Sequence, residues 1–261
     1  MIRFVDSKNA EKDYLSACRI DNVYGAINAY LYRSHSSDKQ AMFWNIYDSN
    51  DILCGNLSFT NNTFTLCAEN DKSIEEVAQF IDFWGNFGSI SCNLCNAKSL
   101  DRFINTPNKI TFGEILCINY TSDTDDISVD ICKDIELYDI FSLFKENFPE
   151  KFADLDFFTF NYDMNYRLRH GESFLYGIKC DGILVSALEV MCKFDNSVLL
   201  GCLATKKDYR NRGFASSLLK FTTTQFPDSD VYIFADNEEL SSFYKKLGFK
   251  KHSEWAELNH V

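Results

Sequence analysis

Hydrophobic and polar residues in the second half of the chain follow the patterns of strands and helices. Alternating or continuously apolar stretches predict strands at residues 173–180, 183–194, 198–205, 231–235 and 250–258. The turn dipeptides Asp181-Gly182 and Asp195-Asn196 separate the first three strands. Apolar residues at helical spacing predict helices at residues 213–226 and 238–247. The second half therefore reads as a meander, a helix, a strand, a helix and a last strand.

The first half repeats this order more faintly. Its patterns predict strands at residues 41–47, 52–59, 63–68 and 89–92. A helix is predicted at residues 73–84, with Ser73 as its N-cap and Glu76 completing a capping box. The repeated order of meander, helix and strand predicts two related domains.

A polar, acidic stretch at residues 121–126 has no hydrophobic periodicity and reads as a loop. We place the domain boundary there, giving domains 1–122 and 123–261. Between residues 141 and 160 the chain is dense in Phe. Helices packed on a sheet are the favoured interpretation, and a hydrophobic lip beside a binding site is the alternative.

Composition excludes several classes of function. The 261 residues include 26 basic and 38 acidic side chains, for a net charge of −12. This balance argues against a general nucleic-acid binder and against an anionic membrane surface as partner. The N-terminal residues lack the apolar stretch of a signal peptide, and the best apolar run, residues 182–192, is too short to span a bilayer. A cytoplasmic location is expected.

The ten cysteines are scattered, which favours reduced thiols over a disulfide framework. One CxxC pair occurs, Cys92 and Cys95. A zinc site would need a second pair or two histidines at matching spacing, and the four histidines do not supply them. Two structural thiols are favoured over a metal or redox site, and no metal is expected.

The most informative segment follows the strand predicted at residues 198–205. Residues 205–212 contain four cationic side chains and one aspartate, a local charge of +3 in an acidic chain. The first N–H groups of a helix have no intrahelical partner, and the helix dipole adds partial positive charge. A phosphate at this junction would be bound by backbone donors, and Gly213 lets it approach closely. A solvated helix start with basic surface residues is the alternative.

The hexapeptide Arg210-Asn211-Arg212-Gly213-Phe214-Ala215 resembles the R/Q-x-x-G-x-G/A motif of the GCN5-related N-acetyltransferase (GNAT) family. A second resemblance follows about thirty residues later, where Asn237 and the run Phe243-Tyr244-Lys245-Lys246-Leu247-Gly248-Phe249 are similar to the family's N…FYxKLGF signature. The resemblance covers roughly residues 130–258. The resemblance implies an α/β (α+β) fold of tandem GNAT-like domains, each a mixed, mostly antiparallel sheet flanked by helices.

In this family the loop and helix start hold the pyrophosphate of acetyl-CoA. The resemblance therefore implies contacts from Arg210, Asn211, Arg212, Gly213, Phe214, Ala215 and Ser216. The stretch at residues 69–73 is the equivalent in the first half. It has no glycine and is acidic, so a degenerate domain that does not bind CoA is expected there.

The implied reaction is direct attack of an amine on the thioester of acetyl-CoA in a ternary complex. Backbone N–H groups at Leu203, Ala204 and Thr205 correspond to the family's donors for the developing oxyanion. Tyr244 stands where the family often carries its general acid, although an aromatic packed beneath the CoA chain is the alternative. Asn237 would contact the pantetheine or the sulfur region.

Two residues are candidates for binding or deprotonating the amine. Glu189 lies mid-strand among apolar residues, where a carboxylate needs a task or a partner. It could act as a base, directly or through water, or stand on the solvent face of its strand. His170 precedes the first strand of the second half, where substrate-facing loops occur in this family, and a histidine there could act as a substrate-site group.

An acetyl-CoA-dependent N-acetyltransferase acting on a small-molecule or peptide amine is the leading hypothesis. A non-catalytic acyl-CoA-binding or regulatory module on the same fold is the alternative, since fold alone does not settle function. A purely structural tandem domain is a third interpretation. The acceptor and the possibility of a homodimer are left open by the sequence.

Overall fold

The computed structural model describes residues 1–105, 108–119 and 129–260, and the boundary predicted at residues 121–126 lies outside this part. The chain forms two compact units. Unit 1 comprises Met1–Leu116, Phe234–Ser242 and Lys251–Val261, and unit 2 comprises Cys117–Ile233 and Phe243–Lys250. The last part of the chain is therefore shared between the units.

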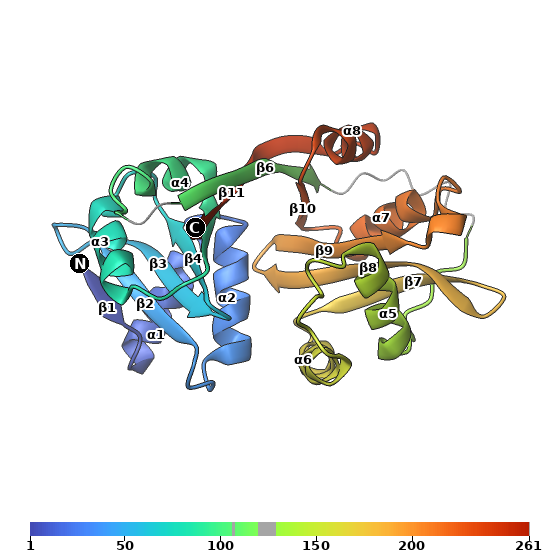
Figure 1. Ribbon diagram of the computed structural model, residues 1–261, viewed down its shortest axis with the longest axis horizontal. Helices are drawn as coiled ribbons and strands as arrows, with labels where there is room; N and C mark the ends of the chain where they lie inside the picture. Colours follow the sequence, from blue (N-terminus) through green and yellow to red (C-terminus); the bar gives the residue numbers. More distant parts are fainter. Residues whose placement is uncertain (106–107, 120–128, 261) are drawn as a thin grey trace. The chain divides into compact units, whose positions relative to one another are not determined.

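One order of elements occurs twice (Figure 1). After β1 (Ile2–Phe4), the first series consists of α1 (Lys8–Ala17), α2 (Tyr24–His35), β2 (Met42–Tyr47), β3 (Leu53–Thr60), β4 (Thr63–Ala68), α3 (Ile74–Trp84), β5 (Ser89–Asn93), α4 (Leu94–Leu100) and β6 (Asn108–Asn119). The second series consists of α5 (Leu137–Asn147), α6 (Phe157–Arg169), β7 (Phe174–Cys180), β8 (Ile183–Phe194), β9 (Ser197–Thr205), the 3-10 turn η1 (Lys207–Tyr209), α7 (Phe214–Gln225), β10 (Asp230–Ala235), α8 (Glu238–Lys246) and β11 (Lys250–His260). The predicted repetition of meander, helix and strand is confirmed.

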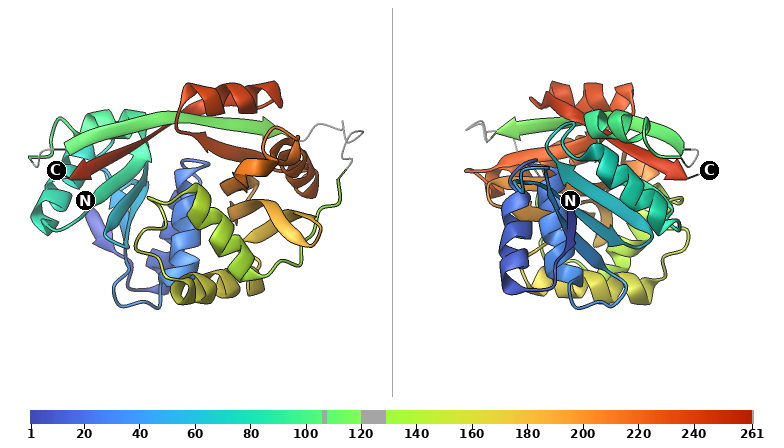
Figure 2. Two further views of the ribbon diagram at one scale, coloured as in Figure 1. Left: turned by 45° about the vertical axis from the view of Figure 1, so that its right-hand side comes forward. Right: turned by 90° about the vertical axis from the view of Figure 1, so that its left-hand side faces the viewer.

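Unit 1 is a sheet with helices on both faces. Its strands lie in the order β1-β2-β3-β4-β5-β11-β6, and β4 and β5 run parallel. On β2, Asn45 donates to the carbonyl of Ala10 in α1, whereas Trp44 and Ile46 pack in the core cluster that includes Ile74 of α3. Because side chains alternate along a strand, α1 and α3 cover opposite faces (Figure 2).

Helix α2 was not predicted because its buried face is weakly hydrophobic. Apart from Tyr24 and Tyr30, its buried residues are small or polar: Gly25, Ala26, Asn28 and Ala29. Asn28 uses its amide to bind Asn56 and the carbonyl of Thr65 in the sheet. A helix that packs through small and polar residues leaves little hydrophobic periodicity to detect.

Strand β11 was predicted from residues 250–258, and it pairs with the first half of the chain. It runs antiparallel to β5, from Trp255 opposite Asn93 to Asn259 opposite Ser89. Ala256 and Leu258 are fully buried in the core of unit 1. Alternating apolar residues predict a strand but not its neighbour, which tertiary pairing selects.

Unit 2 contains strands in the order β10-β9-β8-β7, with β10 parallel to β9. Helices α5 and α6 pack on the sheet through a Phe-rich cluster that includes Phe141, Phe144 and Phe160. The interpretation of residues 141–160 as packing helices is therefore confirmed. Helix α7 also packs on the sheet, where Phe221 meets Tyr176 of β7 edge to face.

The predicted capping box at helix α3 is wrong. Ser73 adopts a left-handed backbone (φ 54°) and makes no side-chain cap. Its hydroxyl donates to the carbonyl of Tyr47, and Glu76 pairs with the N-terminal ammonium of Met1. Ser73 and Glu76 therefore bind partners elsewhere in the fold instead of forming the capping box.

Candidate functional site

Strands β9 and β10 part soon after they begin. Their parallel ladder joins residues 197–199 to residues 230–232 and ends at Leu199 and Tyr232. Strand β9 continues to Thr205, held by β8 on its other side, where Ala204 lies opposite Ala187 and Thr205 opposite Ser186. Over residues 200–205 the backbone groups on the β10 side are therefore available to a ligand.

The end of β9 leads into the basic loop singled out in the sequence. Asn211 and Gly213 both adopt left-handed backbone, at φ 62° and φ 81°. Gly213 precedes α7 and no side chain caps this helix. Left-handed residues in a turn can direct successive N–H groups to one side, which makes a concavity for anions.

Arg210 ties the loop to strand β9 and helix α5, and Arg212 braces the loop internally. Arg210 donates through Nε to the carbonyl of Thr205 (3.2 Å) and through Nη2 to Asn147 Oδ1 (2.8 Å). Arg212 donates to the carbonyl of Asp208 (2.9 Å) and lies over the ring of Tyr209. All of these hydrogen-bond acceptors are neutral carbonyl or amide oxygens. The bonds that hold the loop therefore do not neutralise the positive charge of either guanidinium group.

The space in front of α7 suits a phosphate. A Cβ built on Gly213 meets nothing within 4 Å. The first N–H groups of the helix, at Phe214, Ala215 and Ser216, precede the first helical bond, from Ser217 to the carbonyl of Gly213. An anion can bind at a helix start that offers open space, backbone N–H donors outside the helical bonds and positive charge. This helix start offers all three, with a local charge of +3.

Helix α8 carries the other residues of the sequence signature. Asn237 caps it, because Oδ1 of Asn237 accepts from the N–H of Leu240 (2.9 Å). Tyr244 is 5% exposed, and its ring contacts those of Phe243 and Phe249. The aromatic residues of the motif therefore form one packed cluster around the phenol.

Glu189 is buried and does not lie on the solvent face of its strand. Its Oε1 accepts from Nη2 of Arg167 at 2.8 Å, and both side chains are at most 9% exposed. The same nitrogen of Arg167 donates to the carbonyl of Met191, and Nη1 meets Asp163 at 3.3 Å. Glu189 thus anchors helix α6 to strand β8, through an arginine that the sequence analysis missed.

Cys202 lies on β9 near this pair. Burial, followed by the charge of Glu189, raises the pKa of the Cys202 thiol to about 12. The thiol is therefore protonated near neutral pH and is a poor nucleophile.

His170 follows helix α6 and is exposed. Its ring stacks on Tyr166 at 4.0 Å, and Nδ1 lies 2.7 Å from the carbonyl oxygen of Tyr166. These contacts lie within one turn of the chain, so the structure gives His170 a local partner but no link to the basic loop.

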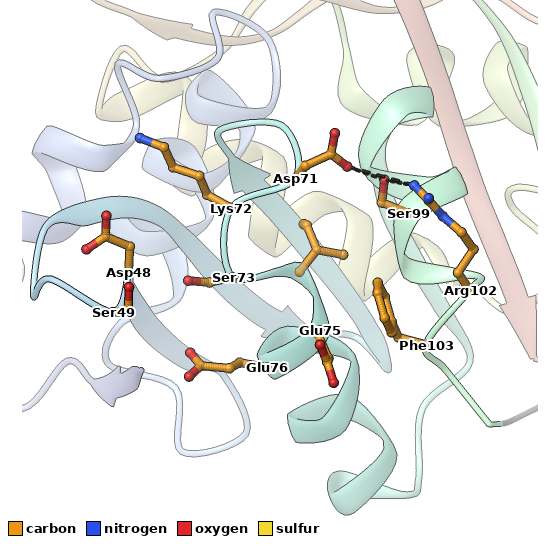
Figure 3. Close-up of a pocket in the computed structure, with 11 residues that line it drawn as sticks. Asp48, Ser49, Asp71, Lys72, Ser73, Glu75, Glu76, Ser99, Arg102 and Phe103 are labelled. Atoms are coloured by element: carbon orange, nitrogen blue, oxygen red, sulfur yellow. Dashed lines mark hydrogen bonds and ion pairs between the residues drawn. The ribbon is translucent and has the colours of Figure 1, made fainter.

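In the first half, the loop before α3 has the same backbone conformation as the basic loop before α7, but its side chains are different. Asp71 (φ 62°) and Ser73 (φ 54°) precede α3 with the same left-handed spacing as Asn211 and Gly213. A pocket of about 660 Å³ lies there, and Figure 3 shows Asp48, Glu75 and Glu76 around it. The acidic side chains of this stretch and its neighbours therefore stand where the second half has a basic loop and Gly213.

Several side chains of this pocket already form hydrogen bonds or ion pairs with neighbouring side chains. Asp71 accepts from Ser99 at 2.5 Å, and Arg102 donates to the same hydroxyl at 2.8 Å (Figure 3). Lys72 pairs with Glu69. The cations that would attract a phosphate are thus committed to neighbouring acids and a hydroxyl.

The corresponding strands of the first half also separate, but a side chain binds the strand end that this leaves. Strands β4 and β5 pair over only three positions, from Thr63 opposite Ser89 to Thr65 opposite Ser91. Beyond them, the buried side chain of Asn96 in α4 donates to the carbonyl of Ala68 at 3.1 Å. A protein amide thus binds the strand end that β9 leaves open.

The CxxC cysteines occupy different environments. Cys92 is fully buried in β5, where burial raises the pKa of its thiol, and Cys95 is exposed on α4. Over the residues that the structure describes, no group of three or more His, Cys, Asp or Glu side chains could hold a metal. In the same ranges no helix has the length and apolar character to span a membrane.

Comparisons with known proteins agree with the repeated fold. Residues 171–251 match the family model described as acetyltransferase (GNAT) domain, and no curated protein sequence matches the chain. A GNAT-family acetyltransferase from Colwellia psychrerythraea superposes over 100% of both chains, with a TM-score of 0.64 and 12% identity. A tandem GNAT protein from the clavulanic acid biosynthesis pathway, described as without AcCoA, has a TM-score of 0.67 at 11% identity, covering 99% of this chain and 98% of its own.

A GCN5-related N-acetyltransferase from Sphaerobacter thermophilus has a TM-score of 0.65 at 11% identity, covering 99% of this chain and 94% of its own. Residues 171–251 are thus similar in sequence to a GNAT domain, and the whole chain has the fold of tandem GNAT proteins. The resemblance and the mixed α/β fold predicted from the sequence are confirmed.

Proposed function

We propose that unit 2 transfers an acetyl group from acetyl-CoA to a primary amine. The observation that carries this proposal is the course of β9, which parts from β10 and leads into the basic, uncapped start of α7. In unit 1 the same backbone lacks both the charge and the open strand. The acetyltransferase domain matched by residues 171–251 and the acetyltransferases among the structural neighbours support the same reaction class.

The residues present fit acetyl-CoA at two places. The N–H groups at the start of α7, with Arg210, Arg212 and the open space beside Gly213, would hold its pyrophosphate. The open side of β9 would bind the amide-containing pantetheine arm as a neighbouring strand would. When bound, acetyl-CoA supplies an acyl thioester.

Backbone donors of β9 would act on the acyl carbonyl oxygen. N–H groups alternate along a strand, and that of Lys206 binds Val185 of β8, so Leu203 and Thr205, at the end of β9, would present their N–H groups on the open side. The hydroxyl of Ser186 donates to the carbonyl of Ala204 at 3.0 Å and lies 2.8 Å from the Thr205 hydroxyl, which holds this end in place. Rigid N–H donors stabilise charge that develops on oxygen during acyl transfer.

Tyr244 is the group proposed to donate a proton to the departing thiolate. Its ring packs against Phe243 of α8 and against Phe249, which follows the helix. Burial raises the pKa of the Cys202 thiol on β9, which makes this cysteine a poor nucleophile, in keeping with direct attack of the amine on the thioester. Glu189 is assigned an anchoring role through Arg167.

Thiol release from acetyl-CoA over a panel of small amines and peptides tests the reaction, and calorimetric titration of acetyl-CoA tests the site. Gly213→Glu should abolish binding, because it adds a carboxylate where phosphate would lie. Ser73→Glu, the same change at the equivalent position of unit 1, should leave binding unaltered. Retained affinity in Gly213→Glu would refute the site.

Tyr244→Phe separates catalysis from binding. Turnover should fall at least tenfold while the Kd for acetyl-CoA changes less than twofold, because only the proton donor is removed. Binding of acetyl-CoA without thiol release for any amine would instead favour a non-catalytic module. Absence of binding would leave a structural tandem domain as the better account.

A further inference from the structure

We infer that unit 2 carries a second, separate ligand site, which takes a small carboxylate with an aromatic or bulky apolar body. The site is a pocket of about 520 Å³ between the start of β7, the end of β8 and the end of α7. It is lined by Lys133, Leu168, Ser173, Phe174, Leu175, Tyr176, Lys193, Gln225 and Phe226. Its volume lies in the range of small-molecule sites, about 300–1,000 Å³.

The floor of the pocket is built from aromatic rings. Phe174 meets Phe226 edge to face at 5.6 Å, and Tyr176 meets Phe221 in the same way at 5.2 Å. Tyr176, Phe226 and the neighbouring Leu175 are buried. Such a surface favours an apolar body over a bare inorganic anion.

Each of the two ring pairs supports one ammonium group. Lys133 Nζ lies 5.5 Å from the ring centre of Phe221 and 5.7 Å from that of Tyr176. Lys193 Nζ lies 5.7 Å from the ring centre of Phe226. Cation–π attraction therefore holds both charges at the pocket instead of leaving them to extend freely into water.

Among the residues that the structure describes, neither lysine forms an ion pair with a carboxylate. Lys133 donates to Gln225 Oε1 at 2.8 Å, a neutral partner that uses one of three ammonium donors. Of the described residues that line the pocket, none is acidic, although the chain as a whole carries a net charge of −12. Two positive charges above an apolar floor select a ligand with a negative end and an apolar body.

This pocket is distinct from the proposed acetyl-CoA site. It contacts Gln225 and Phe226 at the C-terminal end of α7, whereas the basic loop precedes the same helix at Gly213. A 12-residue helix is about 18 Å long, so one ligand group cannot occupy both ends. The inference therefore holds or fails independently of the acetyltransferase reaction.

Calorimetric titration with biphenyl-4-carboxylate tests the site, with biphenyl-4-methanol as the uncharged analogue. The carboxylate should bind, and the alcohol should bind at least tenfold more weakly. The double variant Lys133→Met, Lys193→Met should weaken carboxylate binding at least tenfold, and the double arginine variant, which keeps both charges, should retain it. Thermal melts confirm that each variant is folded.

Lys179→Met, an exposed lysine on the same strand β7, is the matched control and should bind the probe as the unaltered protein does. Gly213→Glu should also leave probe binding unchanged, whatever it does to acetyl-CoA. The inference is overturned by absence of probe binding at millimolar concentration, or by equal binding in the double methionine variant. It is also overturned if inorganic phosphate competes with the probe at equal affinity, because the pocket would then be a bare anion site.

Discussion

Gly213 and Ser73 precede equivalent helices in the two units with the same left-handed backbone, at φ 81° and φ 54°. Gly213 adopts this conformation without strain and leaves open space beside it. Ser73 adopts it with its hydroxyl bound to Tyr47. The fold thus keeps the loop geometry in both units, and side chains decide which loop can receive an anion.

Gly213→Ala should lower the free energy of unfolding by about 1 kcal/mol, because a Cβ is unfavourable in left-handed backbone. It should also weaken acetyl-CoA binding, since the methyl group enters the space before α7. Urea unfolding and calorimetry measure the two effects. An alanine variant that binds acetyl-CoA as tightly as the unaltered protein would contradict close approach at this position.

The pair of Arg167 and Glu189 should be costly to break. Glu189→Ala alone should destabilise the protein by about 3–5 kcal/mol, because it leaves a buried guanidinium with reduced compensation. The double variant Arg167→Met, Glu189→Ala should lose less than the sum of the losses in Arg167→Met and Glu189→Ala. A double-mutant cycle in urea measures the coupling, and additive losses would show that the pair is not coupled.

Cys202→Ala should retain turnover within about twofold if the amine attacks the thioester directly. The raised pKa of Cys202, about 12, keeps this thiol protonated near neutral pH. Steady-state thiol release gives the rate, and mass spectrometry after mixing with acetyl-CoA detects any acylated cysteine. Acetyl found on Cys202 at a rate that matches turnover would establish an acyl-enzyme route instead.

Helix α6 should show a pH-dependent cap. The N–H of Thr159, followed by its hydroxyl, binds the Asp156 carboxylate and lowers its pKa. A lowered pKa in the folded state stabilises the protein above the unfolded value of about 3.9, and this contribution is lost as pH falls through the folded pKa.

Asp156→Asn keeps an acceptor but removes the titration. Its Tm should lie below that of the unaltered protein at pH 7, and the difference should shrink as pH falls below about 4. Asp154→Asn, at an exposed position outside the helix, is the control and should show no such convergence. A difference that stays constant down to pH 2 would argue against the charged cap.

Leu258→Ala should destabilise unit 1, although the residue comes from the end of the chain. Leu258 is fully buried in the core of unit 1, so its loss should cost about 2–5 kcal/mol. Hydrogen exchange should report lost protection first in β5, the strand paired with β11. Loss confined to β7–β9 would contradict the assignment of β11 to unit 1.

The candidate site was largely visible in local sequence. The strand at residues 198–205, the charge of the following loop, Gly213 and the helix beyond it are neighbours in the chain, and the structure keeps them together. By contrast, Arg167 reaches Glu189 from a different element, and no local pattern connects the two. Asn96, which closes the end of β4, likewise acts across the fold.

Alternation and helical spacing by themselves determined most of the strands and helices, the turns and their repeated order, because these depend on neighbours within a few residues. The tertiary structure decided what periodicity cannot encode. It paired β11 with β5. It bound the Ser73 hydroxyl to the carbonyl of Tyr47 instead of to a helix N-terminus, and it paired the buried charge of Glu189 with Arg167. Each of these choices follows from burial. A buried polar group or apolar face is stabilised by a partner, and the local sequence does not specify which partner that is.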